Sequence, residues 1–273
     1  MKSCVTNDAQ EQRAAEALVC LLGIMRQLRD PEKGCPWDIE QDFGTILPYT
    51  IEEAYEVADA IERSDWNQLE GELGDLLLQT VYHAQMGSEV GLFNFASIAN
   101  RVSQKMIERH PHVFGTDGVE RTASEQEINW EKGKARERRM NQETGILDGV
   151  AKALPALTRA AKLQRRAAGI GFDWPDPDGV VAKIREELDE LNEAIEKSDL
   201  ESITEEFGDF LFSCVNLARH LELDPEAVLR AASDKFVGRF EAMERAIRLE
   251  GLEPSKLELS QLDTFWERSK KSR

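Results

Sequence analysis

One pattern of acidic residues occurs twice in this 273-residue chain, with the same internal spacing both times. Each copy, which we call a cassette, has two glutamates three residues apart and, further along, a Glu-x-x-Asp pair. The second cassette follows the first by 134 positions without a gap; the acids are Glu53, Glu56, Glu72 and Asp75, then Glu187, Glu190, Glu206 and Asp209. This repetition predicts two related domains that position their carboxylates in the same way.

The spacing within each cassette predicts an antiparallel helical hairpin. Ser64 lies midway between Glu56 and Glu72, and Ser198 has the same place in the second cassette. A turn at each serine brings the two acidic pairs level, and the aspartate after it suits a helix start. Acids three residues apart share one face of a helix. We therefore expect four carboxylates to converge in each hairpin.

Converging carboxylates indicate a bound cation. Two like charges about 4 Å apart repel by about 4 kcal/mol at an effective dielectric near 20. Oxygen ligands without Cys or His favour Mg2+ or Mn2+ over zinc or copper. The plainer interpretation is a solvated helix face with i, i+4 ion pairs. Two gap-free copies, whose aspartates lie among Leu and Phe, favour the metal site. A di-iron bundle needs Glu-x-x-His, and here Asp stands in place of that His.

Composition excludes several partners. A net charge of −18 disfavours a nucleic-acid polymer or an anionic membrane, because both attract clustered Lys and Arg. The four cysteines show no disulfide or C-x-x-C spacing, which is typical of a reducing cytosol. No apolar run reaches the ~18 residues that span a bilayer, and no signal-peptide pattern is present. We expect a cytoplasmic protein.

Apolar residues recur with the helical period along most of the chain, so the predicted fold is all-α. We expect two tandem helical-bundle domains, at 15–140 and 150–270, with a boundary near 140–150. A hairpin with one apolar seam must bury it against other helices, either from its own repeat or from another subunit, so we expect a helical bundle, with a dimer as one way to complete it. Helices are predicted at 10–29, 46–63, 66–87, 94–109, 124–140, 152–168, 177–197, 200–221, 225–249 and 259–270.

Several residues are suited to holding a nucleotide. Lys183 lies one helical turn before the second cassette, and Lys235 and Arg239 share one helix face, as a point charge and a fork for phosphate. Trp266 offers a flat surface for a nucleobase, although packing of a terminal helix explains it equally well. The segments Gly34-Cys-Pro-Trp-Asp38 and Gly171-Phe-Asp-Trp-Pro175 look like parallel loops that pack the domain entry.

Residues 15–270 resemble the MazG family of two-domain, all-α nucleoside triphosphate pyrophosphohydrolases. The motifs that carry the resemblance are Gly34-Cys-Pro-Trp-Asp38, Thr50-Ile-Glu-Glu-Ala-Tyr-Glu56, Gly71-Glu-Leu-Gly-Asp75, Arg109-His-Pro-His-Val-Phe114 and Gly171-Phe-Asp-Trp174. The resemblance implies Mg2+-dependent hydrolysis of nucleoside triphosphates between the α- and β-phosphates, in a homodimer. It further implies that Glu187, Glu190, Glu206 and Asp209 hold magnesium, and that Lys183, Lys235, Arg239 and Trp266 contact the nucleotide.

The general base stays open in this interpretation. Glu186 adjoins the metal cage and is suited to orient or deprotonate the attacking water, but Glu187 and Glu205 are also candidates. The second cassette is better equipped, because Tyr49 stands in the first where Lys183 stands in the second. Broad base specificity is the expectation. The alternatives are a narrower hydrolase, dUTPase-like or phosphoribosyl-ATP pyrophosphohydrolase-like, and a non-enzymatic helical regulator that binds a basic protein.

Overall fold

The computed structural model describes residues 9–115, 122, 133 and 145–271, and its regular structure in that part of the chain is helical, without a strand. The chain divides into two compact units, residues 1–130 and 131–273. The predicted all-α class is confirmed. The helix predicted over 124–140 and much of the boundary predicted near 140–150 lie outside the described residues, so both stay predictions.

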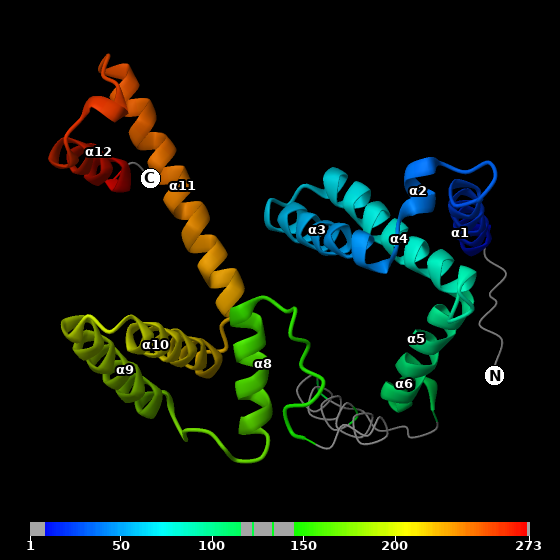
Figure 1. Cartoon of the computed structure of the whole chain (residues 1–273), viewed down its shortest axis with the longest axis horizontal. Helices are drawn as coiled ribbons and strands as arrows, with labels where there is room; N and C mark the ends of the chain where they lie inside the picture. The colour runs from blue at the N-terminus through cyan, green and yellow to red at the C-terminus, as the bar shows by residue number, and fades with distance from the viewer. Residues whose placement is uncertain (1–8, 116–121, 123–132, 134–144, 272–273) are drawn as a thin grey trace. The chain divides into compact units, whose positions relative to one another are not determined.

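The first unit is organised around one helical hairpin. Helices α3 and α4 pack against each other along their length, and α1 and α5 pack on α4 (Figure 1). The core lies between these helices and contains Met25, Ile46, Val81, Tyr82 and Met86. The helices of this unit are α1 (Ala9–Leu28), α2 (Pro36–Glu40), α3 (Phe43–Glu62), α4 (Trp66–Glu89), α5 (Phe95–Arg109) and α6 (Pro111–Phe114).

The second unit repeats the hairpin with α9 and α10, and α8 packs on α10 (Figure 1). Helix α12 packs on the long helix α11, around Met243, Ile247 and Phe265. The elements of this unit are α8 (Ala156–Ala168), α9 (Pro177–Lys197), α10 (Leu200–His220), α11 (Pro225–Leu249), the short 3-10 helix η1 (Pro254–Lys256) and α12 (Leu259–Lys271).

Both hairpins turn at the predicted serines. Ser64 and Ser198 adopt left-handed backbone conformations, with φ of 55° and 56°. This region is uncommon for a residue other than glycine, and the identical conformation in both units reflects the same turn geometry. The next residue caps the following helix in each case: Asp65 accepts from the Gln68 N–H and Asp199 from the Glu201 N–H. The predicted turns are confirmed.

Two helix starts differ from the prediction for local reasons. Helix α8 begins at Ala156 rather than 152, because Pro155 is extended (φ −48°, ψ 142°) and restricts the residue before it. Helix α3 begins earlier, at Phe43, because the Asp42 side chain accepts the N–H groups of Gly44 and Thr45. The helix then continues through Pro48.

Candidate metal and nucleotide site

The second cassette gathers three of its four acids. Glu187 and Glu190 project from α9 and Glu206 from α10, and one carboxylate oxygen from each lies within 4.8 Å of the others. Only oxygen donors meet at this point, a set that suits a hard divalent cation. The hairpin turn brings Glu206 level with two acids that precede it by a whole helical segment.

The charges in this group are costly without a cation. Burial, followed by the charges of Glu190 and Glu187, raises the pKa of Glu206 above its ordinary value. The Glu187 side chain is only 6% exposed. A nearby positive charge would relieve this repulsion, and a divalent cation can do so for all three carboxylates at once.

Lys183 already supplies one positive charge at the edge of this group. Its Nζ lies 2.7 Å from an oxygen of Glu187 and 2.9 Å from an oxygen of Glu186. Hydrogen bonds to Glu187 and then Glu186 raise the pKa of Lys183, so it is fully charged at neutral pH. In this structure, the Lys183 ammonium that we expect to bind a phosphate is bonded to two acids of its own helix, Glu186 and Glu187.

The first cassette repeats the grouping without the lysine. Glu53 and Glu56 on α3 and Glu72 on α4 also place ligand oxygens within 4.8 Å of one another. Burial and then the charge of Asp75 raise the pKa of Glu53. Burial and then the charge of Glu72 raise the pKa of Glu56. Tyr49 occupies the position that matches Lys183, so its ring replaces the ammonium.

The fourth acid of each cassette lies outside the group of three in the described residues. Asp75 is near enough for its charge to act on Glu53, and Asp209 for its charge to act on Glu206. The structure thus places these aspartates around the convergent carboxylates, and their role as metal ligands stays a prediction.

Comparison with known proteins agrees with this duplicated arrangement. The model of the MazG nucleotide pyrophosphohydrolase domain matches residues 41–114 and again 176–243, which contain one cassette each. The chain belongs to the MazG family. It is 47% identical over 253 residues to the nucleoside triphosphate pyrophosphohydrolase of Escherichia coli K12, covering 92% of this chain and 96% of that protein.

A second MazG relative is similarly complete. The nucleoside triphosphate pyrophosphohydrolase/pyrophosphatase MazG of Thermotoga maritima is 44% identical over 251 residues, covering 92% of this chain and 94% of its own. A crystal structure of a mazG-related protein from the same organism aligns with 43% of this chain and 98% of that one, at 29% identity and a TM-score of 0.37.

The other predicted nucleotide contacts of this MazG chain lie on α11 and α12. Lys235 and Arg239 are on one face of α11, and within the described part of the chain neither forms an ion pair with a carboxylate. Trp266 on α12 packs against Phe236 of α11, with ring centroids 5.4 Å apart. The structure does not bring these three residues into the group of Glu187, Glu190 and Glu206, and their contact with a nucleotide stays a prediction.

Two segments that precede the MazG cassettes are held by contacts that the sequence did not predict. The first was predicted as a loop, but most of it forms helix α2 (Pro36–Glu40), which contains Asp38. Tyr82 donates a hydrogen bond to the buried carboxylate of Asp38 at 2.9 Å. In the second unit, Asp173 forms an ion pair with Arg219 and lies 3.1 Å from Nε2 of His220. The partners are more than 40 residues apart, and the only signal in the sequence was the pair of parallel motifs.

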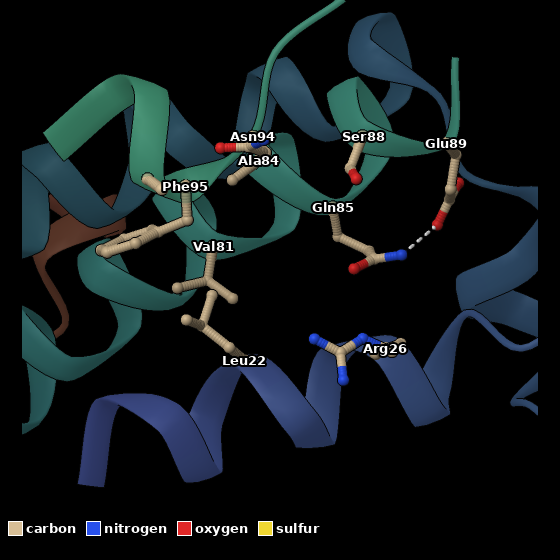
Figure 2. Close-up of a pocket in the computed structure, with 10 residues that line it drawn as sticks. Leu22, Arg26, Val81, Ala84, Gln85, Ser88, Glu89, Asn94 and Phe95 are labelled. Atoms are coloured by element: carbon tan, nitrogen blue, oxygen red, sulfur yellow. Dashed lines mark hydrogen bonds between the residues drawn. The ribbon is translucent and has the colours of Figure 1, made fainter. Parts of the chain in front are cut away.

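A cavity of about 440 Å³ in the first unit lies apart from the MazG cassettes, between α1, α4 and α5 (Figure 2). Leu22, Val81 and Phe95 form its apolar wall, and Arg26 extends into it (Figure 2). None of the cassette acids lines this cavity. None of the helices in the described part of the chain combines the length and apolar character that crossing a bilayer requires.

Proposed function

We propose that this MazG protein hydrolyses nucleoside triphosphates to the monophosphate and pyrophosphate, with Mg2+ or Mn2+ as cofactor, and chiefly at the second cassette. The observation that carries the proposal is the convergence of Glu187, Glu190 and Glu206 within 4.8 Å. It occurs in a chain that matches a nucleoside triphosphate pyrophosphohydrolase over 92% of its length. Because the match extends over nearly all of both chains, it supports an enzyme of the same reaction class.

The cation would be held by Glu187, Glu190 and Glu206, with Asp209 beside them. The raised pKa of Glu206 supports this assignment, because burial and then the charges of Glu190 and Glu187 disfavour its ionised form, and a bound cation would favour that form. When bound, the metal supplies positive charge that stabilises the phosphate oxygens and helps to activate water. In the first cassette, Glu53, Glu56 and Glu72, with Asp75 beside them, would hold a cation in the same way.

Lys183 has two roles in this proposal. Before substrate arrives, its ammonium stabilises Glu187 at 2.7 Å and Glu186 at 2.9 Å. The phosphates of the substrate then compete for the same ammonium, because they carry more negative charge than one carboxylate. The side chain of Glu186 is exposed, and release from Lys183 leaves it available to orient or deprotonate the attacking water. Glu187 and Glu205 are the alternative bases.

Lys235 and Arg239 are proposed to bind the remaining phosphates, and Trp266 is proposed to contact the nucleotide beside them. The two cations share a helix face and lack carboxylate partners in the described residues, which suits capture of a polyanion. Such a site accepts many bases, because every base has a face that can stack on an aromatic ring. Broad base specificity is accordingly proposed, and a narrower dUTPase-like or phosphoribosyl-ATP-like activity is the alternative.

A homodimer is part of the same proposal. Leu73 and Leu77 on α4 are exposed, and so are their repeat counterparts Phe207 and Leu211 on α10. Adjacent exposed apolar side chains on both hairpins are suited to burial against a second copy. Light scattering of the wild-type protein, and of Phe207→Glu as the disrupting variant, tests this part.

The reaction is tested with a panel of ribo- and deoxynucleoside triphosphates, incubated with Mg2+, with Mn2+ and with chelator. The expected products are the monophosphate and pyrophosphate, formed only when the metal is present. Orthophosphate as the first product contradicts cleavage between the α- and β-phosphates. Full activity in chelator contradicts the metal site, and cleavage of a single triphosphate favours the narrower enzyme. No cleavage at all, with binding of a basic protein instead, favours the regulator.

A further inference from the structure

Trp174 is a half-exposed aromatic residue at the entrance to the second cassette. It lies just before α9, and its side chain is 41% exposed. A Cβ atom on Gly179, in the first turn of α9, would overlap the indole ring. The ring therefore lies against the helix backbone at Gly179, where the absence of a side chain makes room for it.

The loop that carries Trp174 is anchored by its neighbour. Asp173 forms an ion pair with Arg219 and contacts His220 near the end of α10, and the side chains of Arg219 and His220 are only 13% and 11% exposed. Burial works against the charge of Asp173, but the hydrogen bonds from Arg219 and His220 outweigh it and lower the pKa of this carboxyl. The loop that exposes Trp174 is therefore fixed to α10, because the adjacent residue, Asp173, is bonded to that helix.

Trp174 is in line with the groups proposed to bind phosphate and metal. Gly179, Lys183 and Glu187 are four residues apart along α9 and share one face. At about 1.5 Å per residue, Gly179 and Glu187 are separated by about 12 Å along the helix. An aromatic ring, an ammonium and a metal-binding carboxylate therefore follow one another along this face. A nucleotide presents a base, phosphates and their bound cation in the same order.

The first unit has a comparable tryptophan. Trp37 is exposed and meets the ring of Tyr49 edge-on, with centroids 6.2 Å apart. Tyr49 occupies the repeat position of Lys183 and lies one helical turn before Glu53. Both units therefore have an exposed tryptophan that precedes the cassette in the chain, before the helix that carries the first two acids. Trp266, by contrast, packs against Phe236.

We infer that Trp174 stacks on the nucleobase of the nucleotide whose phosphates are bound at Lys183 and Glu187. This inference rests on the proposed function and adds a specificity residue to it. Every base has a face that can stack on an indole, so the contact favours nucleotides over inorganic polyphosphate without selecting one base.

Calorimetry of the full chain with Mg2+ tests this contact by comparing two ligands. One is the α,β-methylene analogue of ATP, which is not cleaved between those phosphates, and the other is inorganic tripolyphosphate, which has no base. Trp174→Ala is expected to weaken binding of the analogue by about 10-fold or more and to leave tripolyphosphate within about twofold. Trp174→Phe, which keeps a ring, is expected to retain most of the affinity.

Trp66→Ala is the matched control, because Trp66 is an exposed tryptophan of the first unit. It is expected to bind both ligands as the wild type does. Unchanged affinity of Trp174→Ala for the analogue overturns the inference, and an equal loss for both ligands assigns Trp174 to the structure of the loop. A wild-type protein that binds neither ligand overturns the proposed function itself.

Discussion

Replacing Lys183 by Met should destabilise the metal-free protein by a measurable amount. The ammonium lies 2.7 Å from Glu187, whose side chain is 6% exposed, while the lysine side chain is 32% exposed. Removing one partner of a buried pair costs about 3–5 kcal/mol, whereas an exposed pair contributes about 0–1 kcal/mol. Lys183 is between these limits, so we expect a loss of about 1–2 kcal/mol in the free energy of unfolding.

The raised pKa of Lys183 defines the pH at which this should be measured. Its stabilising effect is fully present below the ordinary lysine pKa and is lost only as pH rises through the higher folded value, so neutral pH is suitable. A double-mutant cycle with Glu187→Gln, followed by urea unfolding, isolates the pair from other changes. Lys197→Met is the matched control, because Lys197 pairs with Glu193 on the same helix and both are exposed.

Saturating Mg2+ is expected to shrink the effect of Lys183→Met on stability, since the cation then provides positive charge beside Glu187. Activity should still fall, through weaker binding of the triphosphate. A coupling energy between Lys183 and Glu187 no larger than that of Lys197 and Glu193 would refute the reasoning. So would a stability loss that is unchanged by Mg2+.

Three further outcomes are expected. Glu190→Gln should reduce hydrolysis by about 10²-fold or more while the protein stays folded by circular dichroism, and Glu56→Gln should retain most of it; the opposite ranking would assign the working site to the first cassette. The pKa of Glu206 is raised, so its contribution to metal-free stability is present below its ordinary pKa and is lost as pH rises through the folded value. In chelator, the melting temperature of Glu206→Gln should therefore fall less steeply with rising pH than that of the wild type. An equal slope would argue against repulsion between Glu206 and the neighbouring carboxylates. Tyr82→Phe leaves the buried carboxylate of Asp38 without its hydroxyl donor, so we expect a loss of about 1–3 kcal/mol in urea unfolding, and no loss would show that another group replaces it.

Local patterns in the sequence were sufficient to predict the hairpins. Helices α9 and α11 begin and end at the predicted residues, 177–197 and 225–249, because caps and apolar period act within the segment itself. The turn at Ser198 then places Glu206 opposite Glu187 and Glu190, since antiparallel helices of known length leave little choice of register. The same local rules missed Asp42 as the start of α3 and the effect of Pro155 on α8.

The sequence by itself therefore determined the all-α class, the duplication and the convergence of acids in each hairpin, because these follow from local spacing. It predicted four converging carboxylates, and the structure groups three of them in each unit. Only the tertiary structure decided how those groups are surrounded. It buries the Glu187 side chain, joins Asp173 to Arg219 and packs Trp266 on Phe236. Burial and charge pairing depend on which helix faces meet, and residues far apart in the chain meet only when the fold is complete.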